Sequence, residues 1–281
     1  MADEKKNVVN TNLIQNIIEQ QIDELEEEEK EKIDFNPMAM YFGEDYVIND
    51  KIIIHQPVIQ DFIDNNESNI YAVIAPFTTN TTSYRVQLWD MGIDWNKISN
   101  HELFAMLIKT INQKYSKIIF GDLDFQCFKM YEKQTENGLE MTLYDDVHDI
   151  EIDEDVRNKM CKYIQFMFNS FPVEEEFTSS KILKQDLINN DRQKQLLKKK
   201  DKKSSSSLLS MVSFCLNHPG FKYKKSELRN VGIVEFMDSV QRLQIYESTH
   251  AILGGAYSGF MDTSKINKDE FNFMRDVRIT A

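Results

Sequence analysis

Acidic side chains and one histidine gather around a predicted β-hairpin in residues 123–146, and they are the residues best suited to chemistry in this sequence. Asp122 and Asp124 lie at its start, and a second group lies at its end, where the returning arm brings it close. Clustered carboxylates with a histidine can hold Mg²⁺ or Mn²⁺ for phosphodiester cleavage, so a metal-dependent nuclease is one hypothesis. The second group consists of Asp145, Asp146, His148, Asp149 and Glu151.

A solvated acidic rim is the alternative interpretation of these carboxylates. The chain carries 33 basic and 46 acidic residues, a net charge of −13, so exposed acidic groups are expected on much of its surface. This interpretation is favoured. We therefore assign no catalytic, cofactor-binding or metal-binding residue from the sequence.

Motifs of other enzyme classes are absent from the sequence. It contains neither G-x-x-x-x-G-K-[ST] nor G-x-G-x-x-G, the glycine-rich loops whose amides cradle phosphates. It also lacks H-E-x-x-H, G-x-S-x-G and a calcium-binding loop. Cys215 and His218 are three positions apart, but no third partner is identifiable, so nucleophilic catalysis is not predicted. We expect a protein without enzymatic activity and without a cofactor.

The isolated cysteines and histidines are interpreted as structural residues. The three cysteines are widely separated and form no CxxC pair, which favours buried, inert thiols in a reducing compartment. Three histidines without a nearby partner are expected to be hydrogen-bonded parts of the fold. These residues are Cys127, Cys161, Cys215, His55, His101 and His250.

The length and composition predict a folded, soluble protein. With 281 residues, of which 41% are hydrophobic, the chain can form one large domain or two modest ones with a substantial core. No apolar run approaches the roughly 18–20 residues needed to cross a bilayer, and the N-terminus has no signal-peptide pattern. A cytoplasmic protein without membrane contacts is expected.

The hairpin is the clearest element that the sequence predicts. Hydrophobic alternation follows both arms of residues 123–146 on either side of Asn137-Gly138, the dipeptide best suited to a type I′ turn. Both faces are largely apolar, with Phe125 on one and Phe128 on the other. We therefore expect the hairpin to belong to a covered sheet or to lie against a partner.

The two tryptophans, Trp89 and Trp95, stand within seven residues of each other. Gly92 suits the end of a helix, and Ser99 with Glu102 forms an S-x-x-E capping box for the next one. The segment is therefore predicted to be a helix, a turn and a second helix. The indole rings are expected to pack the joint between the helices, and an aromatic ligand box is the alternative.

Helices dominate the rest of the pattern. Residues 51–57 favour a strand and residues 58–65 a brief helix, whereas residues 69–77 fit a buried strand or a buried helix equally well. Later helices are predicted after Asp153, after Ser180, over residues 208–217 and over residues 232–260. The last of these is expected to break or kink at Gly254-Gly255. A further capping box, at Asn267 and Glu270, follows it.

These elements predict an α+β fold that is predominantly helical, with a central antiparallel β-hairpin and a helical C-terminal half. Three regions are expected: an acidic amphipathic N-terminal helix or arm in residues 1–37, a mixed α+β domain in residues 38–203, and a helical region in residues 204–281. The four serines at positions 204–207 form the best candidate for an internal linker.

Two charged tracts have opposite signs. Residues 1–37 contain eleven acidic and four basic side chains, a local charge of −7, and the apolar stripe of their helix is expected to dock on the body, on a partner or on another copy. Residues 181–203 contain nine basic and three acidic side chains, a local charge of +6. The lysines of residues 194–203 could contact nucleic-acid phosphates. A solvated helix end is favoured because no aromatic residues alternate with them.

Three stretches together resemble a known group of proteins. They are HQPVIQDF at residues 55–62, SYRVQLWDMGIDWNKISNHELF at residues 83–104 and FKYKKSELRNVGIVEFMDSVQRLQIYE at residues 221–247. In this order and spacing they resemble tail-module proteins of tailed bacteriophages that infect Gram-positive bacteria, which are similar in size to tail assembly chaperones. The likeness covers roughly half of the chain, and the acidic N-terminal helix is not part of it.

This resemblance implies a non-enzymatic role in tail morphogenesis. Tail assembly chaperones keep the long, apolar tape-measure protein soluble until the tube protein polymerises around it, so the implied partners are tape-measure or tail-tube proteins. A structural component of the virion tail or baseplate is the close alternative. The matching motifs are structural, and the resemblance therefore assigns no catalytic residue.

Overall fold

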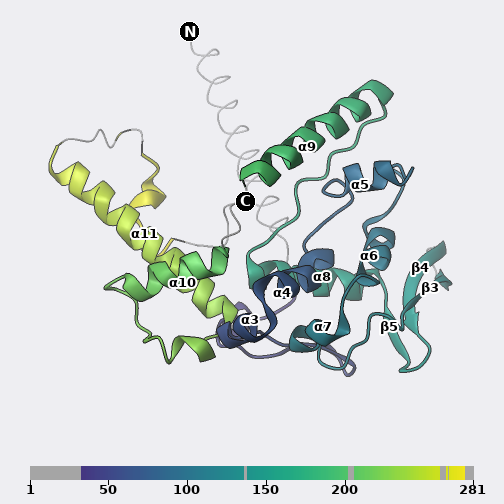
Figure 1. Ribbon diagram of the computed structural model, residues 1–281, viewed down its shortest axis with the longest axis horizontal. Coiled ribbons are helices and arrows are strands. Elements are labelled where there is room, and N and C mark those ends of the chain that lie inside the picture. Colours follow the sequence, from purple (N-terminus) through teal and green to yellow (C-terminus); the bar gives the residue numbers. More distant parts are fainter. Residues whose placement is uncertain (1–32, 136–137, 202–205, 260–263, 265, 276–281) are drawn as a thin grey trace, which may run out of the picture. The chain divides into compact units, whose positions relative to one another are not determined.

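The computed structural model describes residues 33–135, 138–201, 206–259, 264 and 266–275 (Figure 1). The chain divides into two compact units, Met1–Asn36 and Pro37–Ala281. All but the last residues of the predicted acidic helix lie outside the described ranges, so its docking stays a prediction. The second unit contains every element discussed below.

The described residues form an α+β fold with ten α-helices and two small antiparallel sheets, which confirms the predicted class. The predicted strand at residues 51–57 is shorter, and it pairs with a strand that the sequence did not reveal. The ambiguous residues 69–77 are helical. The first elements are α2 (Pro37–Tyr41), β1 (Tyr46–Asn49), β2 (Ile52–Ile54), α3 (Ile59–Asn65), α4 (Glu67–Ile74) and the 3₁₀ turn η1 (Ala75–Phe77).

Five buried phenylalanines, here called the phenylalanine cluster, form the centre of the core. They come from η1, α6 (Asn100–Ile108), α7 (Gln113–Phe120) and the loop that follows α7. The Phe77 ring centroid lies 5.2 Å from that of Phe104 and 4.8 Å from that of Phe120. The cluster consists of Phe77, Phe104, Phe120, Phe125 and Phe128, all at most 3% exposed.

Helix α8 (Glu154–Phe168) connects this core to the remaining layers. The Asp153 side chain accepts a hydrogen bond from the Val156 amide, as expected for an N-cap. One face of α8 is buried, and the helix contacts η1, β1, β5 and α11. The Gln165 side-chain amide donates to the Phe77 carbonyl at 2.9 Å, which ties α8 directly to the phenylalanine cluster.

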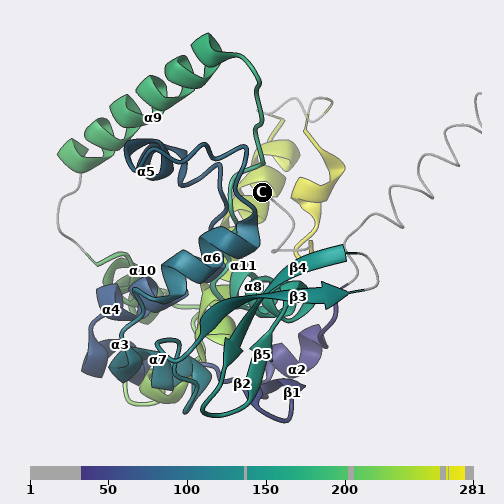
Figure 2. The same ribbon diagram turned by 90° about the vertical axis from the view of Figure 1, so that its right-hand side faces the viewer.

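The predicted hairpin is present, and a third strand joins it. β3 (Lys129–Thr135) pairs with β4 (Gly138–Asp145), and β4 pairs with β5 (Ile150–Ile152), all antiparallel (Figure 2). Thr135 pairs with Gly138. The type I′ turn expected at Asn137-Gly138 would pair Glu136 with Leu139, but Leu139 pairs with Gln134 and Gly138 is the first residue of β4. The predicted position of the turn is therefore wrong.

The first arm of the hairpin was predicted to begin at residue 123, but the strand begins at Lys129 and residues 123–128 form a loop. The prediction is wrong for these six residues. The Asp124 side chain accepts from the Gln126 amide at 2.9 Å, and the Cys127 amide donates to the Asp124 carbonyl at 3.2 Å. These local bonds replace strand pairing. The ammonium group of Lys109 then donates to loop carbonyls, including that of Gln126 at 2.9 Å.

Among the residues whose burial is described, the hairpin is covered at its base, as the sequence predicted. At the base, Thr142 and Leu143 are buried. Residues 131–134 are exposed, and Leu139 near the tip is 68% exposed. No other element covers the tip within the described part of this chain, so the expectation of a fully covered sheet is wrong there. The alternative, that the hairpin lies against a partner, stays a prediction.

The tryptophans pack a helix–turn–helix corner, as expected. α5 (Arg85–Asp90) ends before Gly92, which has a φ of 78°, and the Ser99–Glu102 capping box starts α6. Trp95 is fully buried, and its indole N–H donates to the Glu176 carbonyl at 3.2 Å. The structural interpretation is confirmed because the ring is enclosed by protein and its polar atom is satisfied.

Helix α9 (Lys181–Asp201) lies over α5 and packs on this corner (Figures 1 and 2). Ile188 is fully buried in a cluster with Leu88, Trp95 and other apolar residues of the corner. The Lys184 ammonium pairs with Asp94 at 2.6 Å.

The C-terminal elements correct two expectations. Ser206 caps α10 and Ser207 is its first residue, so half of the predicted serine linker belongs to a helix. The long helix α11 continues through Gly254-Gly255, so the glycines do not end it. The elements are α10 (Ser207–Asn217), η2 (Leu228–Asn230), α11 (Ile233–Tyr257) and η4 (Lys268–Phe271). The last is a single 3₁₀ turn, and the Asn267 side chain accepts a hydrogen bond from the Asp269 amide at its start.

The first and last parts of this unit are joined by backbone and carboxylate contacts. The Ile59 amide donates to the Val231 carbonyl at 3.0 Å, and the Ile233 amide donates to the Pro57 carbonyl at 3.0 Å. Glu67, in the first turn of α4, also accepts from the Leu208 amide of α10 at 3.2 Å. Among the described residues, no helix is long and apolar enough to cross a membrane.

We predict that Ile188→Ala loosens α9 from the corner. Removal of a fully buried isoleucine side chain should lower the free energy of unfolding by about 2–5 kcal/mol. Urea unfolding and hydrogen exchange of α9 amides measure the effect. Leu183 lies on the same helix and is 54% exposed, so Leu183→Ala is the control. It should change the free energy of unfolding by less than about 0.5 kcal/mol. Equal losses for both variants would contradict this packing.

Candidate functional site

Four of the seven residues singled out around the hairpin are held by lysines rather than turned toward one another. Asp146 accepts from the Lys129 ammonium at 3.0 Å and from the Tyr131 hydroxyl at 2.8 Å. These hydrogen bonds, that of Tyr131 first, hold the pKa of Asp146 below its ordinary value. Asp149 pairs in the same way with Lys51 at 2.9 Å and with the Tyr144 hydroxyl.

The two remaining carboxylates of this set also lie near lysines. Glu151 pairs with Lys133 at 2.6 Å, and Asp122 lies 3.6 Å from Lys117. A carboxylate already neutralised by a lysine is a poor ligand for Mg²⁺ or Mn²⁺, which need several free oxygens around one point. The arrangement therefore offers little support for the phosphodiesterase hypothesis.

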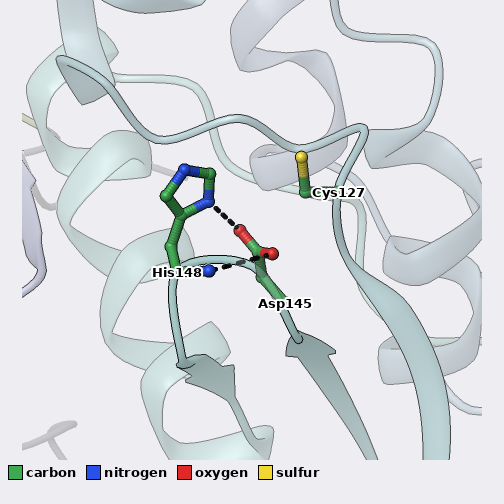
Figure 3. Close-up of side chains that lie close together, drawn as sticks. All are labelled: Cys127, Asp145 and His148. Atoms are coloured by element: carbon green, nitrogen blue, oxygen red, sulfur yellow. Dashed lines mark hydrogen bonds and ion pairs between the residues drawn. The ribbon is translucent and has the colours of Figure 1, made fainter.

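Asp145 and His148 come together with a residue that sequence reasoning had set aside, Cys127. The Asp145 carboxylate is buried, and its Oδ2 lies 2.6 Å from Nδ1 of His148. Its Oδ1 accepts from the Val147 amide at 2.9 Å. One donor atom from each of Cys127, Asp145 and His148 lies within 4.8 Å of the other two (Figure 3).

The electrostatics of this group follow from burial and hydrogen bonding. Burial opposes ionisation of Asp145, but the hydrogen bonds from His148 and from the Val147 amide outweigh it, so the pKa of Asp145 is lowered. Burial raises the pKa of the Cys127 thiol, and the negative charges of Asp124 and Asp145 raise it further. At neutral pH the group thus contains a carboxylate beside a protonated thiol.

Cys127 was missed because its partners come from a different part of the chain. It stands between Phe125 and Phe128, whose burial in the phenylalanine cluster fixes the loop before β3. His148 comes from the turn between β4 and β5. The signal available in the sequence was that a thiol precedes one arm of a hairpin whose other arm ends in an aspartate and a histidine.

The other candidate nucleophile and ligand residues are structural. Cys215 is fully buried, and burial raises its pKa to about 11. His218 bonds to Glu247 through Nε2 at 3.0 Å and to the Gly220 amide through Nδ1 at 3.0 Å, so neither ring nitrogen serves Cys215. His101 was expected to be hydrogen-bonded, but its buried ring nitrogens have no partner among the described residues.

Helix α9 presents a second feature, an exposed apolar surface. Its inner face is held on the corner by Ile188 and by Arg85, which is 7% exposed and bonds to Asp191 and Glu176 at 2.6 Å each. Its outer side carries four large apolar side chains near the two ends of the helix. This apolar surface of α9 consists of Ile182 (75% exposed), Leu183 (54%), Leu196 (58%) and Leu197 (60%).

Comparison with known proteins finds no match for this chain among protein-family models, curated proteins or solved structures.

We predict that Asp191→Asn destabilises the protein at neutral pH by about 1–3 kcal/mol, because buried Arg85 loses a charged partner. Burial raises the pKa of Asp191, but Arg85 more than offsets this and lowers it. The contribution of Asp191 is therefore present above the pKa of an unfolded aspartate and is lost as pH falls through the lower folded pKa.

Urea unfolding from neutral pH to about pH 3 measures this dependence. The difference between the native protein and Asp191→Asn should shrink in acid, where Asp191 itself becomes protonated. Asp186→Asn, an exposed position on the same helix, is the matched control. A difference that persists unchanged at low pH would show that the carboxylate charge is not its cause.

Proposed function

We propose that this chain is a tail morphogenesis protein of a tailed bacteriophage. It acts without catalysis in the cytoplasm of the bacterial host, as an assembly chaperone that binds tape-measure or tail-tube protein. The observation that carries the proposal is the apolar surface of α9, a helix that is packed on one side and leaves large aliphatic side chains exposed on the other. Exposed apolar groups of this kind favour a protein partner.

The geometry of this surface suits a helical client. Ile182 and Leu197 are fifteen positions apart, which corresponds to about 22 Å along an α-helix. Between them the outer side is polar, with Asn189 and Asn190 exposed. An amphipathic segment lying along α9 would bury apolar side chains at both ends and make polar contacts at the centre.

Charge also distinguishes α9 from the rest of the protein. The residues of α9 include seven basic and three acidic side chains, a net charge of +4, on a chain whose total is −13. A client segment that combines apolar and acidic side chains would be attracted to α9, whereas the acidic remainder of the surface would keep the complex soluble.

Two of the three stretches that resemble phage tail-module proteins contact each other, and the third supports α9. Residues 55–62 and 221–247 meet in the backbone hydrogen bonds between Ile59 and Val231 and between Ile233 and Pro57. Residues 83–104 form the corner on which α9 packs. The resemblance and the exposed helix are thus connected physically through residues 83–104, which hold in place the element that presents the apolar surface.

We predict that the double variant Leu196→Glu, Leu197→Glu weakens client binding at least about tenfold, which corresponds to about 1.4 kcal/mol. Two carboxylates placed in an apolar contact would have to be desolvated on binding. The measurement is co-expression with candidate tape-measure and tail-tube proteins, followed by affinity capture and titration of the purified complex.

Leu139→Glu is the matched control, since this leucine is 68% exposed near the tip of the hairpin, away from α9 in the sequence. It should leave capture unchanged. Equal capture by the native protein and the double variant would overturn the assignment of the client site to α9. Failure to capture either tail protein would overturn the proposed function.

A further inference from the structure

The group formed by Cys127, Asp145 and His148 has the donor atoms of a transition-metal site. It offers sulfur, oxygen and nitrogen, and the three atoms lie within 4.8 Å of one another. Tetrahedral Zn²⁺ binds sulfur at about 2.3 Å and nitrogen or oxygen at about 2.0–2.2 Å, which places neighbouring ligand atoms roughly 3.3–3.8 Å apart. Side-chain movements of about an ångström would bring the three donors to these separations.

A fourth donor stands next to them. The Oδ2 atom of Asp124 lies 3.7 Å from the sulfur of Cys127, while its Oδ1 is engaged by the Gln126 amide. The second oxygen is therefore available once the thiol proton is lost. Four protein donors would complete the closed coordination shell that is typical of structural zinc sites.

The donor set selects the class of metal. A thiolate together with an imidazole and carboxylates suits Zn²⁺ and similar thiophilic ions, whereas Mg²⁺ and Mn²⁺ prefer oxygen ligands. The local charge also favours a cation, because Asp124 and Asp145 both lie near the sulfur of Cys127. A thiolate with these two carboxylates would carry three negative charges, and a divalent ion would offset most of them.

The site has an approach from solvent. Asp124 and His148 line a hollow of about 220 Å³ whose wall also includes Lys51, His55 and Asp122. The imidazole of His148 is 53% exposed, so an ion can reach the site without opening the core.

We propose that Cys127, Asp145 and His148, with Asp124 as the fourth ligand, bind a structural Zn²⁺ ion. The ion would fasten together the loop before β3, the end of β4 and the turn that leads to β5. It stabilises the base of the hairpin and has no part in phosphodiester cleavage. The site is independent of α9, so its test and that of the proposed function give separate answers.

Titration of the metal-free, full-length protein with Co²⁺ tests the site. We expect the intense visible bands of tetrahedral Co²⁺, a near-ultraviolet thiolate-to-cobalt charge-transfer band, and loss of both when Zn²⁺ displaces the cobalt. Zn²⁺ should also raise the melting temperature in a concentration-dependent manner, because it binds the folded state.

Cys127→Ser should abolish the charge-transfer band and weaken Zn²⁺ binding by about tenfold or more, and His148→Gln should weaken it by a similar factor. Asp146→Asn, at the next position along the chain from Asp145 but bonded to Lys129, is one control, and Cys215→Ser is the thiol control. Both controls should bind as the native protein does. Absence of the charge-transfer band in the native protein, or unchanged affinity in Cys127→Ser, would overturn the proposal.

Discussion

The phenylalanine cluster is the constraint on which the rest of this structure depends. Phe77 stands at its centre. The centroid of its ring lies within 5.8 Å of the ring centroids of Phe104, Phe120 and Phe125. Burial of each such ring contributes about 1.5–3 kcal/mol, so the cluster holds η1, α6, α7 and the loop before β3 in one arrangement. α8 is attached to the same centre through Gln165. The position of Cys127 beside Asp145 is a consequence of this packing, since both neighbouring phenylalanines are buried.

The parts of the fold that could be predicted from sequence are those decided locally. The capping box of Ser99 and Glu102 and the N-cap at Asp153 place helix starts correctly, because each satisfies amides within three residues. The alternation after Lys129 predicts the hairpin, although its register differs from the one that an Asn137-Gly138 turn implies. The burial of Trp95 was also predictable, because Gly92 and the following cap leave an indole at a helix joint.

The parts that could not be predicted depend on contacts between distant residues. The loop of residues 123–128 has the alternation of a strand, but Lys109, from the end of α6, bonds to its carbonyls and excludes a strand partner. Ser206 and Ser207 have the composition of a linker, but their hydroxyl groups donate hydrogen bonds to Glu67, a residue distant in the sequence. Of the seven candidates at the hairpin, only Asp124, Asp145 and His148 lie near a common point, because nearby lysines engage the other four.

Glu67 has a consequence for the order in which this protein folds. Glu67 lies in the first turn of α4. Its carboxylate accepts hydrogen bonds from the Ser207 hydroxyl and the Leu208 amide at the start of α10, 140 and 141 positions later in the chain. A short helix such as α10 gains little from its own hydrogen bonds in water. Closing a loop of this length is entropically unfavourable before the contact exists, so we expect α10 to be completed only after the part of the fold that holds Glu67 in place has formed.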